Sequence, residues 1–114
     1  MVWKLLDSLE GLETLLAESD TKDVVIFKHS TSCSISHMAK MRLEDKWDLN
    51  ETDIYYLDLK RYRNISDAIA EKFNVHHESP QILLIRNRAC IYDASHFDIS
   101  VEELKESIAW HTAP

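Results

Sequence analysis

The segment DVVIFKHSTSCSIS, residues 23–36, joins two different patterns of apolar residues. Its first part, Asp23 to His29, is a β-branched and apolar run of the kind found in strands that are buried on both faces of a sheet. From Cys33 onwards the period becomes helical, and one apolar face is carried by Ile35, Ala39, Leu43 and Trp47. The segment therefore predicts a buried strand, a short polar turn and a helix, with a cysteine where the helix begins.

The same alternation of strand and helix patterns continues on both sides of this segment. Strand patterns fall at residues 2–6, 52–59, 81–86 and 89–94. Helical patterns are carried by Leu9, Leu12, Leu15 and Leu16, by Ile65, Ala68, Ile69 and Phe73, and by residues 101–111. Asn87 and Arg88 form the short turn expected between the last two strands.

Polar residues mark where three of these helices are expected to begin. Asp7 followed by Glu10 resembles a capping box, with Asp in place of Ser or Thr. Asn64 or Ser66 is the expected cap of the third helix, and Ser100 is that of the last. Such side chains accept hydrogen bonds from the free N–H groups of a first helical turn.

This order of elements predicts one α/β domain over residues 1–114. Alternating strands and helices imply a central sheet of parallel strands with helices on both faces, to which the closing hairpin adds antiparallel strands. In open sheets of this kind, ligands bind outside the carboxyl ends of the parallel strands. Cys33 directly follows such a strand end, which makes it a candidate site residue.

The composition of the chain argues against several classes of function. The formal net charge of −7 opposes non-specific binding to nucleic acid and to anionic membranes. No apolar run reaches membrane-spanning length, and the first residues show no secretory signal pattern. Cys33 and Cys90 alone make no disulfide framework, so a reducing cytoplasm is expected. A single glycine argues against a Gly-rich phosphate loop, and the adjacent His76 and His77 lack the spaced partners of a metal site.

The position of Cys33 favours a reactive thiolate. A helix start presents free N–H groups and a partial positive charge of about +0.5, and both stabilise a thiolate relative to a thiol. The expected donors are the N–H groups of Ile35 and Ser36 and the Ser36 hydroxyl, and a protonated His37 one turn along would add to them. An inert, buried cysteine is the alternative, but such a cysteine prefers apolar company. The neighbours here are polar: Ser30, Thr31, Ser32, Ser34 and Ser36.

Three segments resemble the monothiol bacilliredoxins, which are redox proteins of the bacillithiol system with the thioredoxin fold. They are KHSTSCSIS at 28–36, FNVHHESPQILLIRN at 73–87 and DASHFDIS at 93–100. The resemblance covers most of the chain, from about Val24 to Trp110. The family's active segment reads Thr-Cys-Pro-Ile-Ser, whereas residues 32–36 read Ser-Cys-Ser-Ile-Ser. Ser34 thus replaces a proline that would make the first helical residue rigid.

The resemblance implies a thiol–disulfide oxidoreductase that works with one cysteine. Cys33 would take a low-molecular-weight thiol, bacillithiol, from mixed disulfides on client proteins, and a second small thiol would then release it. Bacillithiol would thus be a co-substrate, and no bound cofactor, nucleic acid or membrane partner is expected. Ser36 is the second implied catalytic position. The implied substrate-binding residues are Ser32, Ser34, Ile35, Ser79, Pro80 and His96.

Other residues near the predicted site allow two interpretations each. Ser79–Pro80 is implied to be a cis peptide that faces the cysteine, whereas a proline at a strand start is the alternative. His96 either contacts the substrate or lies in a solvated loop. Cys90 is expected in the core or at a sheet edge, with a resolving thiol as the less favoured role.

A basic cluster follows the second buried strand and so belongs to the ligand edge of the sheet. Lys60, Arg61 and Arg63 could attract the carboxylates of a small anionic thiol, although a solvated basic loop is the favoured interpretation.

Two functions of other classes remain open. One is a non-catalytic adaptor that binds a partner protein around Cys33 and Pro80. The other is an iron–sulfur carrier like the Cys-x-x-Ser monothiol glutaredoxins, although the glycine that these have after the cysteine is Ser34 here.

Overall fold

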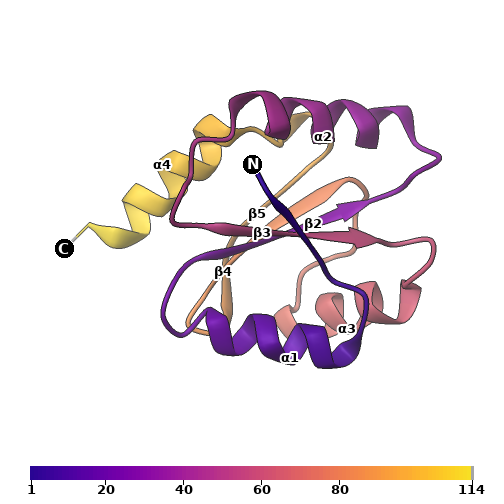
Figure 1. The fold of residues 1–114 in the computed structure, drawn as a ribbon, viewed down its shortest axis with the longest axis horizontal. Helices are drawn as coiled ribbons and strands as arrows, with labels where there is room; N and C mark the ends of the chain where they lie inside the picture. Colours follow the sequence, from indigo (N-terminus) through magenta and orange to yellow (C-terminus); the bar gives the residue numbers. More distant parts are fainter. Residues whose placement is uncertain (114) are drawn as a thin grey trace.

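The computed structural model describes residues 1–113, and it contains one mixed sheet between two layers of helices (Figure 1). The strands are β1 (Trp3–Leu5), β2 (Val24–His29), β3 (Asp53–Asp58), β4 (Gln81–Arg86) and β5 (Ala89–Ser95). The helices are α1 (Leu9–Glu18), α2 (Ser34–Lys46), α3 (Arg63–Phe73) and α4 (Val101–Thr112), with a short 3-10 helix, η1 (His96–Asp98). None of the helices in the described part of the chain is long and apolar enough to cross a membrane.

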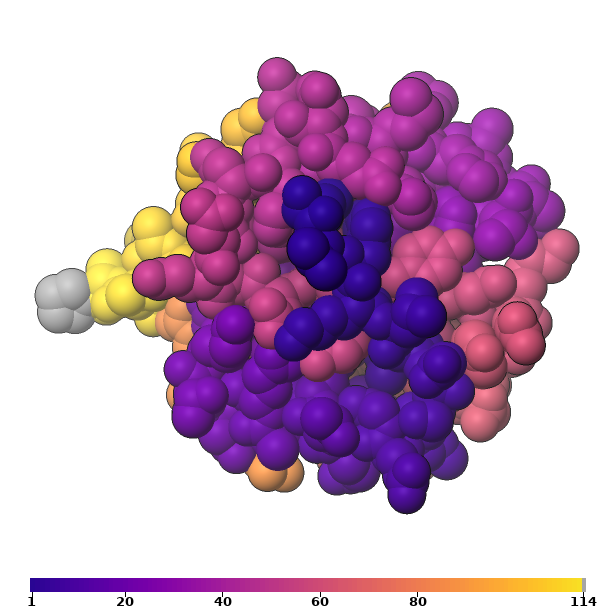
Figure 2. Space-filling view, in the orientation of Figure 1, coloured from indigo at the N-terminus to yellow at the C-terminus, as the bar shows by residue number. Residues whose placement is uncertain are grey.

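The sheet has the strand order β1-β3-β2-β4-β5. β1, β3 and β2 are parallel, β4 runs antiparallel to β2, and β5 runs antiparallel to β4. The predicted parallel sheet with a closing antiparallel hairpin is therefore confirmed. β1 is a three-residue edge strand, and its indigo residues lie on the surface of the molecule in Figure 2. At the other edge, the pairing of β5 with β4 shifts register between Leu84 and Ile85.

Alternate side chains of the central strand β2 enter two separate layers of core. Val24 and Ile26 pack in one cluster with residues of α1 and α3, while Val25 and Phe27 pack in the other with residues of α2 and α4. Figure 1 shows these helix pairs on opposite faces of the sheet. Because the strand is covered on both faces, its whole length is buried, as its apolar run predicts.

The apolar face of α2 differs from the expected stripe at both ends. Ala39 and Leu43 are buried as predicted, but Ile35 and Trp47 are only half-buried. At the start of the helix, Ser36 is buried in place of its neighbour Ile35, with none of its surface exposed. A buried hydroxyl needs hydrogen-bond partners, and the structure supplies two for Ser36 in the first turn of α2.

Two of the predicted helix caps are wrong. Ser8 caps α1 in place of Asp7, and its Oγ accepts a hydrogen bond from the Gly11 N–H at 2.9 Å. The chain is still paired with β3 at Leu6, so the helix starts one residue later than a cap at Asp7 requires.

Tyr62 occupies the cap position of α3, which has no side-chain cap, so neither Asn64 nor Ser66 serves. Ser66 is buried inside the helix, where its hydroxyl contacts His77.

Two local predictions agree with the structure. Ser100 caps α4 by accepting a hydrogen bond from the Glu103 N–H at 3.1 Å. Asn87 and Arg88 form the two-residue turn of the last hairpin, with φ angles of 49° and 66°.

Candidate active site

Cys33 occupies the N-cap position of α2, at the carboxyl end of the parallel strand β2. Its N–H donates to the Ser30 carbonyl at 3.1 Å, and its own carbonyl accepts from the His37 N–H at 3.1 Å. The side chain is half-buried, unpaired in any disulfide, and makes no capping hydrogen bond. The first turn of α2 contains no acidic residue to oppose the positive helix end. The backbone thus fixes Cys33 at a helix start and leaves its sulfur available for exchange.

The Ser36 hydroxyl, which the sequence offers as a donor to the thiolate, has two other hydrogen-bond partners in the structure. Its Oγ lies 2.6 Å from His29 Nδ1 and accepts a hydrogen bond from the Ser30 N–H at 3.0 Å. A hydroxyl has one proton, so when His29 carries its hydrogen on Nε2 and Nδ1 accepts from Ser36, that proton is not available to the sulfur of Cys33. Ser36 instead ties the first turn of α2 to the end of β2.

His29 is a buried, neutral imidazole beneath residues 30–36, which we call the active-site segment. Burial, followed by the nearby charge of His37, lowers its pKa from 6.5 to about 4. Its ring stacks on Phe27, with ring centroids 5.6 Å apart. Because the ring is neutral at pH 7, Nδ1 can accept the Ser36 proton, and the other nitrogen then carries the hydrogen.

His37 lies one turn along α2, as predicted, but its ring is directed to its neighbours on the segment. Its Nε2 is 2.8 Å from the Thr31 carbonyl, so this nitrogen is the donor. The ring stands edge-on to His29, with centroids 4.7 Å apart. His37 therefore braces the turn between β2 and α2 from outside, while Ser36 holds it from inside.

The loop before β4 forms a second part of the candidate site. The Ser79–Pro80 peptide bond is cis, and the Pro80 carbonyl accepts from the His96 N–H at 3.0 Å. His96 Nε2 lies 3.4 Å from a Glu78 carboxylate oxygen. The structure therefore joins Pro80 and His96 by a backbone hydrogen bond, while the buried hydroxyl of Ser79 has no hydrogen-bond partner among the described residues. η1, which begins at His96, also packs beside α2.

The remaining predicted residues lie on the active-site segment itself. Ser32 and Ser34 are exposed and Ile35 is half-buried, around the start of α2. Ser32 has a partner from another element, because Lys60 Nζ lies 3.2 Å from its Oγ. This contact connects the basic cluster after β3 to the residue immediately before Cys33.

Sequence reasoning missed the two polar residues that end the buried strand. Lys28 is fully buried on the α3 side, where its Nζ lies 3.2 Å from the Ser66 carbonyl and 3.4 Å from His77 Nδ1. Burial lowers the pKa of Lys28 from 10.5 to about 8. The signal was present in the run VVIFKH, since a charged residue and a histidine at the end of a buried strand must both find partners.

Cys90 has the surroundings of a structural cysteine. It is half-buried in β5, packs against the core cluster of α1 and α3, and its Sγ lies 3.4 Å from the Tyr92 carbonyl. Burial raises the pKa of the Cys90 thiol to about 11, so at pH 7 it remains protonated. These contacts support a core role.

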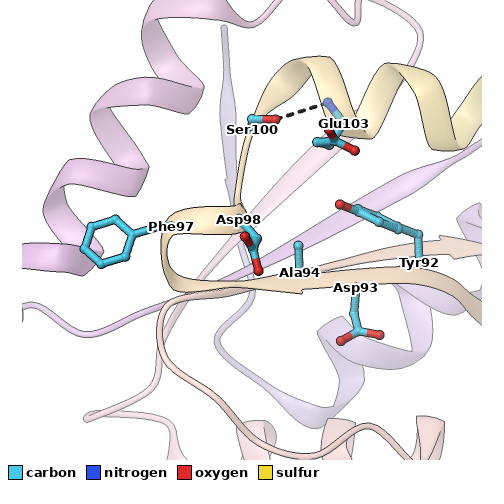
Figure 3. Close-up of a pocket in the computed structure, with 7 residues that line it drawn as sticks. All are labelled: Tyr92, Asp93, Ala94, Phe97, Asp98, Ser100 and Glu103. Carbon is cyan, nitrogen blue, oxygen red and sulfur yellow. Dashed lines mark hydrogen bonds between the residues drawn. The ribbon is translucent and has the colours of Figure 1, made fainter.

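A hollow of about 520 Å³ lies between β5, η1 and α4 (Figure 3). It is lined by Tyr92, Asp93, Ala94, Phe97, Asp98, Ser100 and Glu103. Figure 3 shows the Phe97 ring directed away from the other side chains and Ser100 engaged in its helix cap.

Within residues 1–113, no group of three or more His, Cys, Asp or Glu side chains is placed to hold a metal ion.

Comparisons with known proteins agree with this geometry. A family model described as monothiol bacilliredoxin BrxC matches residues 4–104. A solved thioredoxin-fold protein, provisionally described as an oxidoreductase, is 34% identical, with 94% of each chain covered and a TM-score of 0.84. Thioredoxin from Fasciola hepatica is 15% identical over 96% of this chain and 99% of its own, with a TM-score of 0.76. Thioredoxin from Malassezia sympodialis is 17% identical over 99% and 92%, with a TM-score of 0.75, and these last two matches concern the fold alone.

Proposed function

This chain belongs to the family of monothiol bacilliredoxin BrxC, and from that premise we propose that Cys33 removes a small thiol, bacillithiol, from mixed disulfides on client proteins. One observation supports this proposal above the others. Cys33 is a free, half-buried cysteine at the start of α2. Ser36 stands where a resolving cysteine would be, and its hydroxyl is hydrogen-bonded to His29. The site therefore offers one sulfur nucleophile and no second sulfur in that turn.

The proposed exchange takes two steps. The Cys33 thiolate attacks the small-thiol sulfur of the mixed disulfide, so that a new S–S bond forms, the old one breaks and the client leaves as a thiolate that takes a proton from water. A second small thiol, as its thiolate, then attacks the same capping sulfur. This step restores the Cys33 thiolate and releases a disulfide of two small thiols. Each step oxidises one sulfur and reduces another, so no further oxidant or reductant is needed.

The rest of the site contributes positioning and charge. The positive start of α2 favours the thiolate in both the attacking and the leaving role. Ser36 and His37 hold the turn that carries Cys33 to β2, through His29 and Thr31. We further propose that the backbone of Ser79, before the cis proline, pairs with the bound substrate, and that the protein works in a reducing cytoplasm.

The test is the release of a labelled cap from a model protein under excess small thiol, with intact-mass analysis of each variant. Cys33→Ser should abolish release, because a serine hydroxyl is essentially un-ionised at neutral pH. Cys90→Ser should keep most of the activity, because the raised pKa of the Cys90 thiol keeps it protonated at neutral pH. Comparison of bacillithiol with other small thiols tests the identity of the co-substrate, and the mass of an adduct on Cys33 names the thiol.

Two results would overturn the proposal. Full release by Cys33→Ser would exclude exchange at this cysteine and leave a non-catalytic adaptor. Accumulation of a capped Cys33 in Cys90→Ser would instead identify Cys90 as a hidden resolving thiol.

A further inference from the structure

Lys60 is held against the active-site segment by the pairing of two strands. The Leu59 N–H donates to the His29 carbonyl at 3.0 Å, so the chain leaving β3 stays beside the end of β2. Asp58 Oδ1 then accepts from the backbone N–H groups of Lys60 and Arg61, at 3.2 and 3.4 Å. From this braced turn the Lys60 side chain reaches Ser32, with its Nζ 3.2 Å from the hydroxyl oxygen.

The charge of Lys60 has no carboxylate partner in the part of the chain that the structure describes. The protein is acidic overall, with 20 Asp and Glu against 13 Lys and Arg, and most of its basic side chains form ion pairs. Among residues 1–113, no ion pair involves Lys60 or its neighbour Arg61. Arg61 instead lies over the Tyr62 ring, with its guanidinium carbon 5.5 Å from the centroid.

The cations Lys60 and Arg61 therefore face solvent at the carboxyl ends of β2 and β3, which is also where Cys33 lies. Both side chains are exposed, and the ammonium of Lys60 lies on the residue just before Cys33. A small thiol joined to Cys33 must place its remaining atoms within a few bonds of that sulfur. A negative group on such a thiol would find an unpaired ammonium nearby, whereas a neutral thiol would gain nothing from it.

We propose that Lys60, assisted by Arg61, forms a subsite for the carboxylate of the small thiol carried on Cys33, and so selects anionic thiols. This inference rests on the proposed exchange at Cys33. It assigns the basic cluster a specificity role in place of a solvated loop. Lys60 is exposed and its ammonium is hydrogen-bonded to the exposed Ser32, so its replacement should leave the fold intact.

The experiment measures the second-order rate at which Cys33 reacts with disulfide probes, in a Cys90→Ser background. One probe, 5,5′-dithiobis(2-nitrobenzoate), carries a carboxylate on each half, and the other, 4,4′-dithiodipyridine, is neutral. In each reaction the Cys33 thiolate forms a disulfide with one half of the probe, and the other half leaves as a coloured thiolate or thione. The ratio of the two rates cancels any general change in the reactivity of Cys33.

Lys60→Gln should lower the ratio of the rate with the carboxylated probe to the rate with the neutral probe by about 1.5- to fivefold, as expected for one exposed charge pair. Lys60→Glu should lower it further, because a like charge repels the probe. Lys72→Gln, which removes an exposed lysine from the far end of α3, should leave the ratio unchanged. The Lys60 effect should shrink in 0.5 M salt, since exposed charges are screened.

Four results would overturn the inference in distinguishable ways. An unchanged ratio in both Lys60 variants, with Cys33 still reactive to the neutral probe, would refute the subsite and leave the proposed function standing. An equal drop in Lys72→Gln would show an effect of net charge alone. A larger Lys60 effect with coenzyme A disulfide than with the carboxylated probe would assign the subsite to phosphate. A Cys33 that reacts with neither probe would defeat the proposed function together with the subsite.

Discussion

Replacement of the buried lysine of β2 by methionine should change how the stability of this protein depends on pH. Lys28 is fully buried, and its Nζ contacts the Ser66 carbonyl and His77 Nδ1. Burial lowers its pKa from 10.5 to about 8, and the nearby charges of Asp67 and Arg63 oppose each other as smaller influences. The folded protein therefore releases the Lys28 proton at a lower pH than the unfolded chain does.

The sign and size of the effect follow from this difference in pKa. Between pH 8 and 10.5 the unfolded chain binds more protons at Lys28 than the folded protein, so stability rises with pH in this range. A pKa lowered from 10.5 to about 8 corresponds to about 3 kcal/mol, which the wild type lacks below pH 8 and recovers above pH 10.5. Lys28→Met removes the titrating group and with it this dependence. At pH 7 the variant no longer bears the free-energy cost of burying a charged amine. It also leaves the Ser66 carbonyl unpaired, which costs about 1–3 kcal/mol.

Urea unfolding of wild type and Lys28→Met at several pH values from 7 to 10.5 is the assay. The free energy of unfolding of the wild type, relative to the variant, should rise by up to about 3 kcal/mol across this range. Lys72→Met, at an exposed position, is the matched control and should run parallel to the wild type. Parallel curves for Lys28→Met would show that the buried amine titrates normally. A wild type that loses stability against the variant would show that the folded protein holds the charged form.

Three further predictions concern the two cysteines and the polar residues that hold the helices. Iodoacetamide at pH 7.5 should label Cys33 faster than Cys90, because burial raises the Cys90 pKa to about 11; peptide mapping checks this, and equal rates would contradict it. Ser36→Ala should cost about 1–3 kcal/mol in urea unfolding, since His29 and the Ser30 N–H both lose a buried partner; a loss under about 0.5 kcal/mol would count against this network. Ser8→Ala should cost about 1 kcal/mol and Asp7→Ala far less, and the reverse order would restore Asp7 as the cap.

The order of the strands and helices, and the position of Cys33 at the start of a helix, could be predicted from the sequence. The apolar run VVIFKH and the helical period after Cys33 are patterns of neighbouring residues, and the strand and the helix that they predict are both found there. The turn at Asn87 and Arg88 and the cap at Ser100 also depend only on neighbouring backbone, and both agree with the structure. The cis form of the Ser79–Pro80 bond came from the family resemblance, since composition and periodicity do not bear on it.

The contacts that the sequence did not reveal are all between elements. Ser36 was expected to serve the sulfur of Cys33, but the packing of α2 on β2 brings it to His29 first. The partners of Lys28 come from α3 and from the loop before β4, which no local pattern relates to β2. Ser8 caps α1 in place of Asp7 because the chain is still hydrogen-bonded to β3 at Leu6, which is a contact between two elements of the sheet.

The two edges of the sheet bear on how this protein behaves when it is crowded. An unpaired strand edge is a template for aggregation, and natural proteins blunt it with short strands, charges and register shifts. β1 offers only three residues, one of them the exposed Lys4, and the pairing of β5 is interrupted at Leu84 and Ile85. Neither edge presents a long, flat and uncharged row of N–H and C=O groups. Both edges therefore carry features that disfavour the edge-to-edge joining of two copies of this chain.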